Sequence, residues 1–565
     1  MALRFGEVLV EKGFISAQQL AEAVKEQRQT KEMLGQILIR RGLISERDLL
    51  MVLAEQQGLE FVDLKQLNVP DHVIKSVPAR FVWHYKVMPI SIQGDVLTVA
   101  TSDPFDVWAI DDLETNLNLR VEKVLALRSD IEEAIHRYYG VGADTIENIL
   151  SSGDAKERNA DVELVHRRDE DLDVGEEDAS VVKLVNQILE EAIKARATDI
   201  HFERAKDGLH LRYRVDGLLR DVPVSDDIKY LYPSIVSRIK VLSSLDIVER
   251  RMPQDGRAVI KPKSVGGEYD LRISVMPSLY GENIVIRLLP KEVIFDISDL
   301  GMSEEYLAVL ESLLRKPYGV IFATGPTGSG KSTTLYACLS RINTRDKKIV
   351  TIEDPVEYEL NGVTQTQVNV KIGLTFARIL RSMLRHDPDV IMVGEVRDIE
   401  TAEITIQTAL TGHLVFSTLH TNDAAGGVSR LIDMGIDPFL ITSSVEAFMA
   451  QRLVRKICEQ CKEKVRVSKV ELGMDIDGVG DELEIFRGRG CRECNNTGYK
   501  GRTGIYEILL VSDEIKRLIT QKASSDVIRE CAVKLGMKTV RQSGWEKVLA
   551  GITTPEEVIR VTQVA

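Results

Sequence analysis

The residues from Gly325 to Thr333 carry the clearest chemistry in the sequence. They read GPTGSGKST and match the pattern GxxxxGK[ST], in which backbone N–H groups cradle nucleotide phosphates. Glycines let these groups converge on an anion at a helix N-terminus, where the helix dipole favours negative charge. Lys331 is expected to reach the terminal phosphates and Ser332 a magnesium ion. The predicted nucleotide site comprises Gly325, Pro326, Thr327, Gly328, Ser329, Gly330, Lys331, Ser332 and Thr333.

Acidic side chains follow two further apolar segments. Residues 348–352 read as a buried strand that leads into Glu353, Asp354 and Glu357, and residues 390–393 read as another that leads into Glu395. The carboxyl ends of parallel strands face the ligand in a nucleotide-binding sheet, so these acids are placed to meet magnesium and the attacking water. Glu395 is the candidate for orienting or deprotonating that water.

Two details complete the predicted catalytic set. The usual first acid of the pair that contains Glu395 is replaced by Gly394, so Glu353, Asp354 and Glu357 are the available metal ligands. His420 follows a third strand-like run, residues 414–417, and is expected to sense the presence of the γ-phosphate.

Four of the six cysteines form two CxxC pairs, Cys458 with Cys461 and Cys491 with Cys494. Tetrahedral zinc needs such a grouping, and a CxxC pair turns sharply enough for both sulfurs to face one ion. We predict structural zinc rather than redox chemistry, because the protein fills all four ligand positions. Cys338 and Cys531 lack a partner motif and are interpreted as small core residues.

The elements around the phosphate pattern have the order that it requires. Residues 320–323 read as a short buried strand and residues 334–339 as an opening helix. The chain has 565 residues, too many for one core, so three or four domains are expected. The alternation of strands and helices around the motifs predicts an α/β core.

The composition limits the class of protein. A formal net charge of −14 argues against a protein that tracks nucleic acid, which would normally show a basic footprint. No apolar run approaches the length of a membrane span, and the first residues lack the layout of a signal peptide. We therefore expect a cytoplasmic protein without nucleic-acid partners.

An internal repeat marks the N-terminal part. Residues 4–27 align with residues 33–56, and each copy reads as a short helix, a turn with glycine, a serine N-cap and a second helix. A duplicated helical docking domain is the interpretation that needs no ligand. Residues 61–140 change to short apolar runs, so a small α/β unit is expected to complete a domain over residues 1–140.

The remaining boundaries follow from composition. Residues 141–178 are rich in acids and poor in aromatics, which predicts a flexible linker. A helix from Ser180 and several strand-like runs predict a second domain over residues 179–293. Residues 294–565 then form the nucleotide-binding domain with C-terminal helices, and the cysteines define a zinc subdomain at about 455–505.

Four motifs in order resemble those of the secretion and pilus-assembly ATPase family, which comprises the type II secretion E proteins and the type IV pilus extension motors. They are GPTGSGKSTT, TIEDPVEY (the aspartate box), RHDPDVIMVGEVRD (the Walker B segment) and TGHLVFSTLHTNDA (the histidine box). The resemblance implies a RecA-like P-loop NTPase core beside a PAS-like α+β second domain. It also implies a homo-hexameric ring in which arginines of the second domain, here Arg257 and Arg272, reach the nucleotide.

The same resemblance implies a function. Such a protein is a cytoplasmic hexameric ATPase that hydrolyses ATP with Mg²⁺ to drive pilin or pseudopilin assembly. It associates peripherally with the inner membrane through a platform protein and a cytoplasmic docking protein. Secretion and extension members often carry the tetracysteine zinc cluster, whereas retraction motors usually lack it. Type II secretion and type IV pilus assembly share all of these motifs, so that choice stays open.

The duplicated N-terminal pattern resembles the cyclic di-GMP-binding domain of some such motors, built from paired RLGxxL…GxI…L..Q units. The matching residues are Arg4, Gly6, Gly13, Gln27, Gly35 and Gly42. The first copy has Phe5 where leucine is usual, and the second has Met33 in place of the arginine, which would weaken contacts to guanine or phosphate. Docking to the membrane platform partner is the alternative.

Two other functions remain open for the whole chain. One is a nucleotide-gated scaffold that binds ATP with negligible turnover. The other is a DNA-translocating RecA-like ATPase, which the acidic balance opposes. Lys331 and Glu395 favour the hydrolysing motor.

Overall fold

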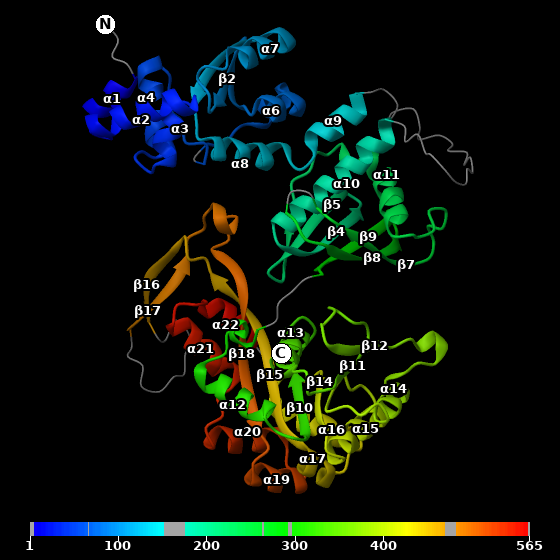
Figure 1. Cartoon of the computed structure of the whole chain (residues 1–565). Coiled ribbons are helices and arrows are strands. Elements are labelled where there is room, and N and C mark those ends of the chain that lie inside the picture. Colours follow the sequence, from blue (N-terminus) through cyan, green and yellow to red (C-terminus); the bar gives the residue numbers. More distant parts are fainter. Residues whose placement is uncertain are drawn as a thin grey trace. The chain divides into compact units, whose positions relative to one another are not determined.

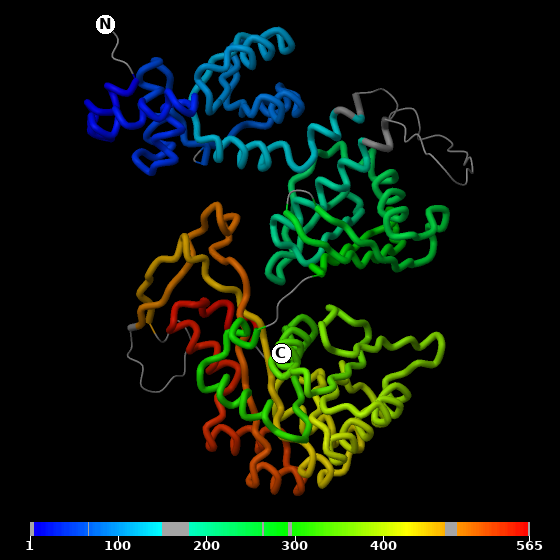
Figure 2. Tube along the Cα trace, viewed as in Figure 1, coloured from blue at the N-terminus to red at the C-terminus, as the bar shows by residue number. Residues whose placement is uncertain are grey.

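The chain divides into two compact units, Met1–Leu288 and Leu289–Ala565, each with hydrophobic cores of its own. The structure, a computed structural model, describes residues 5–65, 67–151, 176–262, 265–291, 296–468 and 482–562 (Figure 1). Figure 2 follows the chain through these segments in sequence order.

Four helices open the first unit in two helix–turn–helix pairs, as the internal repeat predicts. They are α1 (Phe5–Glu11), α2 (Ala17–Thr30), α3 (Leu34–Arg40) and α4 (Glu46–Gln57). Ser16 and Ser45 cap α2 and α4 by accepting backbone N–H groups at 3.2 and 3.1 Å. A Cβ on Gly6 would lie 2.6 Å from Leu20, and one on Gly35 would lie 2.8 Å from Leu49. Close packing between paired helices therefore explains these two glycines.

A small α/β unit follows these helices. Its sheet has the order β1-β2-β3, with β1 antiparallel and β3 parallel to β2. The strands are β1 (Met88–Gln93), β2 (Val96–Thr101) and β3 (Arg120–Leu125), and the helices are α5 (Asp71–Ser76), α6 (Ala79–Tyr85), α7 (Val107–Leu117) and α8 (Arg128–Tyr139).

The predicted flexible linker over residues 141–178 is wrong at both ends. Residues Ala143–Ser151 form α9, and α10 (Glu176–Lys194) begins before residue 178. Ile146 and Ile149 are 1% and 5% exposed and belong to the same core as α10. This apolar pair gives an acid-rich segment a face to bury, which average composition does not reveal. Residues 152–175 lie outside the described residues.

A six-stranded sheet carries the second part of the first unit. Its order is β6-β5-β4-β9-β8-β7, and α10 and α11 pack on one face (Figure 1). The elements are β4 (Ala197–Ala205), β5 (Gly208–Val215), β6 (Leu218–Asp221), α11 (Ile228–Leu242), β7 (Gln254–Ile260), β8 (Tyr269–Ser278) and β9 (Gly281–Pro290). This helix-covered sheet is the PAS-like α+β part of the fold.

The second unit is built on a seven-stranded sheet with the order β12-β11-β13-β14-β10-β15-β18. Neighbouring strands are parallel except for β18, which is antiparallel to β15. The strands are β10 (Gly319–Thr324), β11 (Ile349–Glu353), β12 (Val363–Gln367), β13 (Val390–Val393), β14 (Leu414–Leu419), β15 (Val445–Ile457) and β18 (Tyr499–Leu510).

Helices cover both faces of this sheet, which explains its nearly continuous apolar strands. Along β10, Val320 and Phe322 enter one core while Ile321 and Ala323 enter the other. The helices are α12 (Glu304–Leu314), α13 (Lys331–Ile342), α14 (Phe376–Met383), α15 (Ile399–Leu410), α16 (Ala424–Asp433), α17 (Pro438–Ser444), α19 (Asp513–Thr520), α20 (Ser525–Lys534), α21 (Val540–Leu549) and α22 (Pro555–Thr562), with short 3₁₀ turns η1 (Ile297–Leu300) and η2 (Val370–Ile372). The predicted α/β class with a RecA-like P-loop core is confirmed.

Between β15 and β18 the chain forms a separate hairpin and a cysteine-bearing turn. These are β16 (Lys462–Ser468), β17 (Glu482–Gly488) and η3 (Arg492–Cys494). Among the described residues, no helix is both long and apolar enough to cross a membrane.

Candidate functional site

The phosphate-binding pattern forms the loop between β10 and α13. Gly325, Gly328 and Gly330 have φ values of +146°, +78° and +91°, which residues with a side chain rarely adopt. A Cβ on Gly325 would also lie 2.7 Å from the carbonyl oxygen of Gln451 on β15. These glycines are therefore required by the loop's conformation and by the strand packed against it.

Lys331 folds back onto this loop. Its Nζ donates hydrogen bonds to the carbonyl oxygens of Gly325 at 2.7 Å and Pro326 at 3.0 Å. Burial lowers the pKa of Lys331 to about 8, although the charge of Glu395 raises it, and nearby Arg452 lowers it further. Among the described residues Lys331 forms no ion pair within 4.0 Å, so its ammonium is held in place without a direct counter-charge.

A nucleotide phosphate fits these residues. It would supply the anion that buried Lys331 lacks, at the N-terminus of α13. The hydroxyl oxygen of Ser329 is buried and has no hydrogen-bond partner among the described residues, so it is available to an added ligand. Ser332, on the first turn of α13, is exposed and free to reach a metal ion bound to phosphate.

Glu395 lies two residues after the end of β13, and its side chain is 12% exposed. Nε2 of His420, at the end of neighbouring β14, lies 3.4 Å from Oε2 of Glu395. Arg397 pairs with Oε1 of the same carboxylate at 2.7 Å. Because Glu395 also acts electrostatically on Lys331, the structure brings the predicted residues Lys331, Glu395 and His420 into one site.

The acids after β11 have different surroundings. Glu353 is buried and accepts hydrogen bonds from the hydroxyl of Tyr336, from Thr351 at 2.6 Å and from Gln365 at 3.1 Å. Both of its carboxylate oxygens thus hold protein donors, which favours a positioning role over metal ligation. Asp354 is exposed, and Glu357 is half-buried and donates its backbone N–H to the Tyr336 oxygen at 3.3 Å.

The two predicted arginines belong to the first unit. Arg257 on β7 and Arg272 on β8 face each other as cross-strand partners. Arg257 is exposed, and Nε of Arg272 lies 4.0 Å from the Asp270 carboxylate. The two arginines are therefore neighbours on adjacent strands of one sheet.

The four glycines among the candidate dinucleotide residues have structural explanations. Gly13 and Gly42 occupy turns at φ values of +75° and +68°, and an added Cβ would meet nothing within 4 Å at either. Gly6 and Gly35 are the close-packing positions described above, and Gln27 on α2 is half-buried. Arg4 lies outside the described residues.

The four cysteines of the two CxxC pairs form one cluster. Their sulfur atoms all lie within 4.8 Å of one another, and the Cys458–Cys491 and Cys461–Cys494 pairs are 3.7 and 3.8 Å apart. A tetrahedral zinc ion about 2.3 Å from each sulfur would space the sulfurs about 3.8 Å apart. The cluster therefore has the dimensions of a zinc site.

Backbone groups favour the thiolate at Cys494, whereas burial raises the pKa of the Cys458 and Cys461 thiols. Burial raises the pKa of the Cys494 thiol, but N–H groups of Cys491 and Gly498, each 3.2 Å from the sulfur, lower it to about 6. Thiolates are the form that binds zinc.

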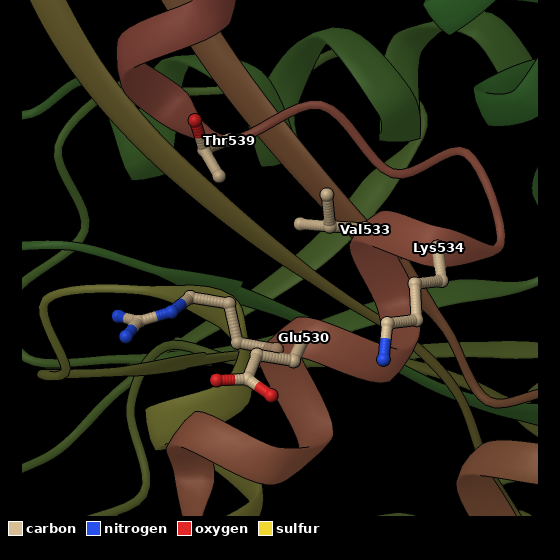
Figure 3. A pocket seen from close by; sticks show the side chains of 5 residues that line it. Glu530, Val533, Lys534 and Thr539 are labelled. Atoms are coloured by element: carbon tan, nitrogen blue, oxygen red, sulfur yellow. The ribbon is translucent and has the colours of Figure 1, made fainter.

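A separate hollow of about 280 Å³ lies beside α20 (Figure 3). Its lining residues are Arg529, Glu530, Val533, Lys534 and Thr539. None of these belongs to the predicted nucleotide, metal or dinucleotide residues, so this hollow is distinct from those sites.

Three residues that contact the predicted nucleotide and catalytic site were not predicted from the sequence. Arg397 falls within the quoted Walker B segment, two residues after Glu395, so the sequence could have suggested an ion pair between them. Tyr336 lies within the helix that follows the phosphate pattern and gives no local sign of reaching Glu353. Arg452 gives no signal, because it depends on the parallel pairing of β15 with β10.

Comparisons with known proteins agree with this architecture. The protein-family model described as type II/IV secretion system protein matches residues 174–560, and an MshEN domain model matches residues 57–145. The type IV pilus assembly ATPase PilB of Myxococcus xanthus (strain DK1622) is 44% identical over 568 residues, covering 99% of both chains. Type II secretion system protein E of Xanthomonas campestris pv. campestris is 42% identical over 518 residues, covering 90% of this chain and 89% of that protein.

A solved structure agrees in fold. The ATPase DotB of Yersinia pseudotuberculosis has a TM-score of 0.51 at 19% identity, over 71% of this chain and 97% of that one. With a family match over most of its length and relatives above 40% identity across nearly all of it, the chain belongs to the type II/IV secretion system protein family and is a P-loop ATP hydrolase.

Proposed function

We propose that this chain hydrolyses ATP to drive the assembly of pilin-like subunits, in a type II secretion machine or a type IV pilus. The observation that carries the proposal is the 3.4 Å approach of His420 to Glu395, which follow two neighbouring parallel strands, together with the electrostatic effect of Glu395 on Lys331 at the N-terminus of α13. The names of the two relatives, a pilus assembly ATPase and a secretion system protein E, support both machines equally.

Each residue has a distinct part in the proposed reaction. ATP with Mg²⁺ supplies the phosphoryl group that is transferred to water. Lys331 would hold the negatively charged phosphates at the phosphate loop, and Ser332 would bind the metal ion. Glu395 orients or deprotonates the attacking water, with His420 beside its carboxylate. Asp354 and Glu357 are further candidates for the metal, whereas Glu353 positions the segment that carries them.

The assembled protein is proposed to be a homo-hexamer on the cytoplasmic side of the inner membrane. A platform protein and a cytoplasmic docking protein would hold it there. Arg257 and Arg272 are proposed to reach a nucleotide in this ring, where an arginine near the transferred phosphoryl group can raise the rate by about 10³ or more. The four cysteines would hold one structural Zn²⁺ in each chain.

Phosphate release by the purified full-length protein tests the catalytic assignment. Glu395→Gln should lower kcat by about 10² to 10⁴ while nucleotide still binds, because it removes the base and leaves the phosphate loop intact. Glu403→Gln, an exposed acid on α15, is the matched control and should hydrolyse at the wild-type rate. Equal rates for Glu395→Gln and wild type would reject the role of Glu395, and no turnover by wild type would favour the nucleotide-gated scaffold.

The N-terminal domain is proposed to bind cyclic di-GMP. The repeated motif supports this, and the MshEN model matches residues 57–145, which directly follow the repeat. The alternative, docking to a membrane partner, needs no ligand. Calorimetry with cyclic di-GMP should show binding to the full chain that Arg4→Ala weakens and that Arg28→Ala, which replaces an exposed arginine on α2, leaves unchanged. Absence of binding by wild type would favour docking alone.

A further inference from the structure

Arg452 on β15 joins three segments of the nucleotide site. Its Nη1 donates to the carbonyl oxygen of Gln451 at 3.0 Å, and its Nη2 donates to the carbonyl oxygen of Asn422 at 2.8 Å. A Cβ on Gly325 would lie 3.2 Å from Nη1, so the guanidinium also touches the start of the phosphate loop. One side chain thus contacts β15, the phosphate loop and the loop that follows β14.

The loop after β14 carries His420. Asn422 is two residues further along, and the next residue, Asp423, caps α16 by accepting from Gly426 at 2.6 Å. Thr324, the last residue of β10, donates to the Asp423 carbonyl oxygen at 3.3 Å. This loop is therefore fixed at its far end, and Arg452 holds the part nearest to His420.

Arg452 is also a cation without a direct counter-charge among the described residues. It is half-buried, and burial lowers its pKa, while the more distant carboxylates of Asp423 and Glu507 raise it. No carboxylate among the described residues lies within 4.0 Å of it. The positive charge of Arg452 also lowers the pKa of Lys331, so two partly buried cations lie beside the phosphate loop.

A structural role alone does not account for this arrangement. Neutral donors can satisfy the carbonyl oxygens of Gln451 and Asn422, and burying an unpaired charge is costly. An anion on the phosphate loop would compensate both Lys331 and Arg452. The planar guanidinium can do this while keeping its other N–H groups on the two carbonyls.

We propose that Arg452 is a positioning residue of the ATPase site, which strengthens phosphate binding by its charge and holds the His420 loop against the phosphate loop by its fork of donors. The inference rests on the proposed ATPase function.

Two substitutions separate the charge from the fork. Arg452→Gln removes the charge, and Arg452→Lys keeps the charge but cannot bond both carbonyls at once. The matched control is Lys456→Gln, which removes an exposed cation from the same strand. ATP affinity is measured in the Glu395→Gln background, where hydrolysis is slow, and kcat and KM are measured with Glu395 present.

Arg452→Gln should weaken ATP binding by about 10- to 100-fold, the range of a lost charge-assisted hydrogen bond. The Kd of Arg452→Lys for ATP should be within about threefold of the wild-type value, whereas its kcat should be at least about tenfold lower than that of wild type. If Arg452 acts through the His420 loop, Arg452→Lys and His420→Ala should not lower kcat additively.

Two results would overturn the inference. One is Arg452→Gln matching Lys456→Gln in affinity and kcat. The other is Arg452→Lys matching wild type in affinity and kcat, which would show that bonding both carbonyls at once has no role. If Arg452→Gln fails to fold, the kcat of Arg452→Lys and its cycle with His420→Ala decide the question. Because wild type is assayed alongside, its own lack of turnover would instead reject the proposed function.

Discussion

At the scale of single residues, Lys331 shows how burial prepares a site for its ligand. Its ammonium is held by two carbonyl oxygens of its own loop, and its pKa is lowered to about 8. A bound phosphate would stabilise the charged form and raise that pKa again. Nucleotide binding above the lowered pKa should therefore be coupled to proton uptake.

ADP affinity is accordingly expected to fall as pH rises from 7 to 9. Below about pH 8 the free lysine is already charged, whereas above it each binding event must first protonate the amine, so log Kd rises by up to about one per pH unit. Phosphate groups, with a second pKa of about 6, are ionised throughout this range. Calorimetric titration at several pH values measures the effect.

Lys331→Arg is the control for this pH dependence. Its guanidinium stays charged over the whole range, so any affinity it retains should not change between pH 7 and 9. Wild-type affinity that stays constant over the same range would contradict the assigned pKa.

The sequence predicts part of this site because its chemistry is local. Nine consecutive residues specify the phosphate loop, and Glu395 and His420 each follow an apolar run that is recognisable as a strand. The Arg452 contacts were not predictable, since they require β15 to lie beside β10, 120 residues or so earlier in the chain. The sequence also did not predict that both carboxylate oxygens of Glu353 accept hydrogen bonds from the protein, because the donors lie on three different elements.

At the scale of elements, Tyr336 links the helix of the phosphate loop to the acidic segment after β11. Its hydroxyl donates to buried Glu353 and accepts the backbone N–H of Glu357. A movement of α13 on nucleotide binding would therefore reach residues 353–357 through one side chain.

Tyr336→Phe should reduce the free energy of unfolding by about 1–3 kcal/mol, because it leaves a buried carboxylate without one of its donors. Urea denaturation measures this change. Tyr318→Phe, at a side chain that is 53% exposed, removes a hydroxyl without that loss and should be neutral. A Tyr336→Phe protein as stable as the control would show that the contact contributes nothing to stability.

The cysteine cluster makes its own prediction at this scale. Purified protein should contain one zinc ion per chain by elemental analysis, and Cys461→Ser should lose it and melt at a lower temperature. Cys531→Ser, outside the cluster and half-buried, should keep both zinc and melting temperature. Full retention of zinc by Cys461→Ser would exclude four-cysteine ligation.

Helix α9 shows where prediction at the element scale fails. Residues 141–178 average to an acidic, aromatic-poor segment, yet Ile146 and Ile149 are buried in the core that contains α10. The stabilising partner lies some 30 residues later in the chain, so local composition could not reveal it. The parallel strands β10, β11, β13 and β14 were easier to predict, since burial on both faces makes them continuously apolar, whereas β12 and β15 were not predicted.

At the scale of the whole molecule, the proposed ring sets a measurable mass. Light scattering with ATP bound to the Glu395→Gln protein should give six times the chain mass of 63.2 kDa. Nucleotide binding favours whichever assembly binds it more tightly, so removing ATP should shift the population toward smaller species. A protein that stays monomeric at saturating ATP would contradict the ring and, with it, any role for Arg257 and Arg272 across subunits.

The pairing of β15 with β18 has a further consequence. Ile457 and Tyr499 lie opposite each other in that ladder, so the chain leaves and re-enters the sheet at neighbouring positions. Opposite Cα atoms of antiparallel strands are about 4.5–5.5 Å apart, a gap that a tight two-residue turn can close. We therefore expect excision of the cysteine-bearing appendage to preserve the strand pairing but to expose Trp545 and Val558, which share a small core with Ile485.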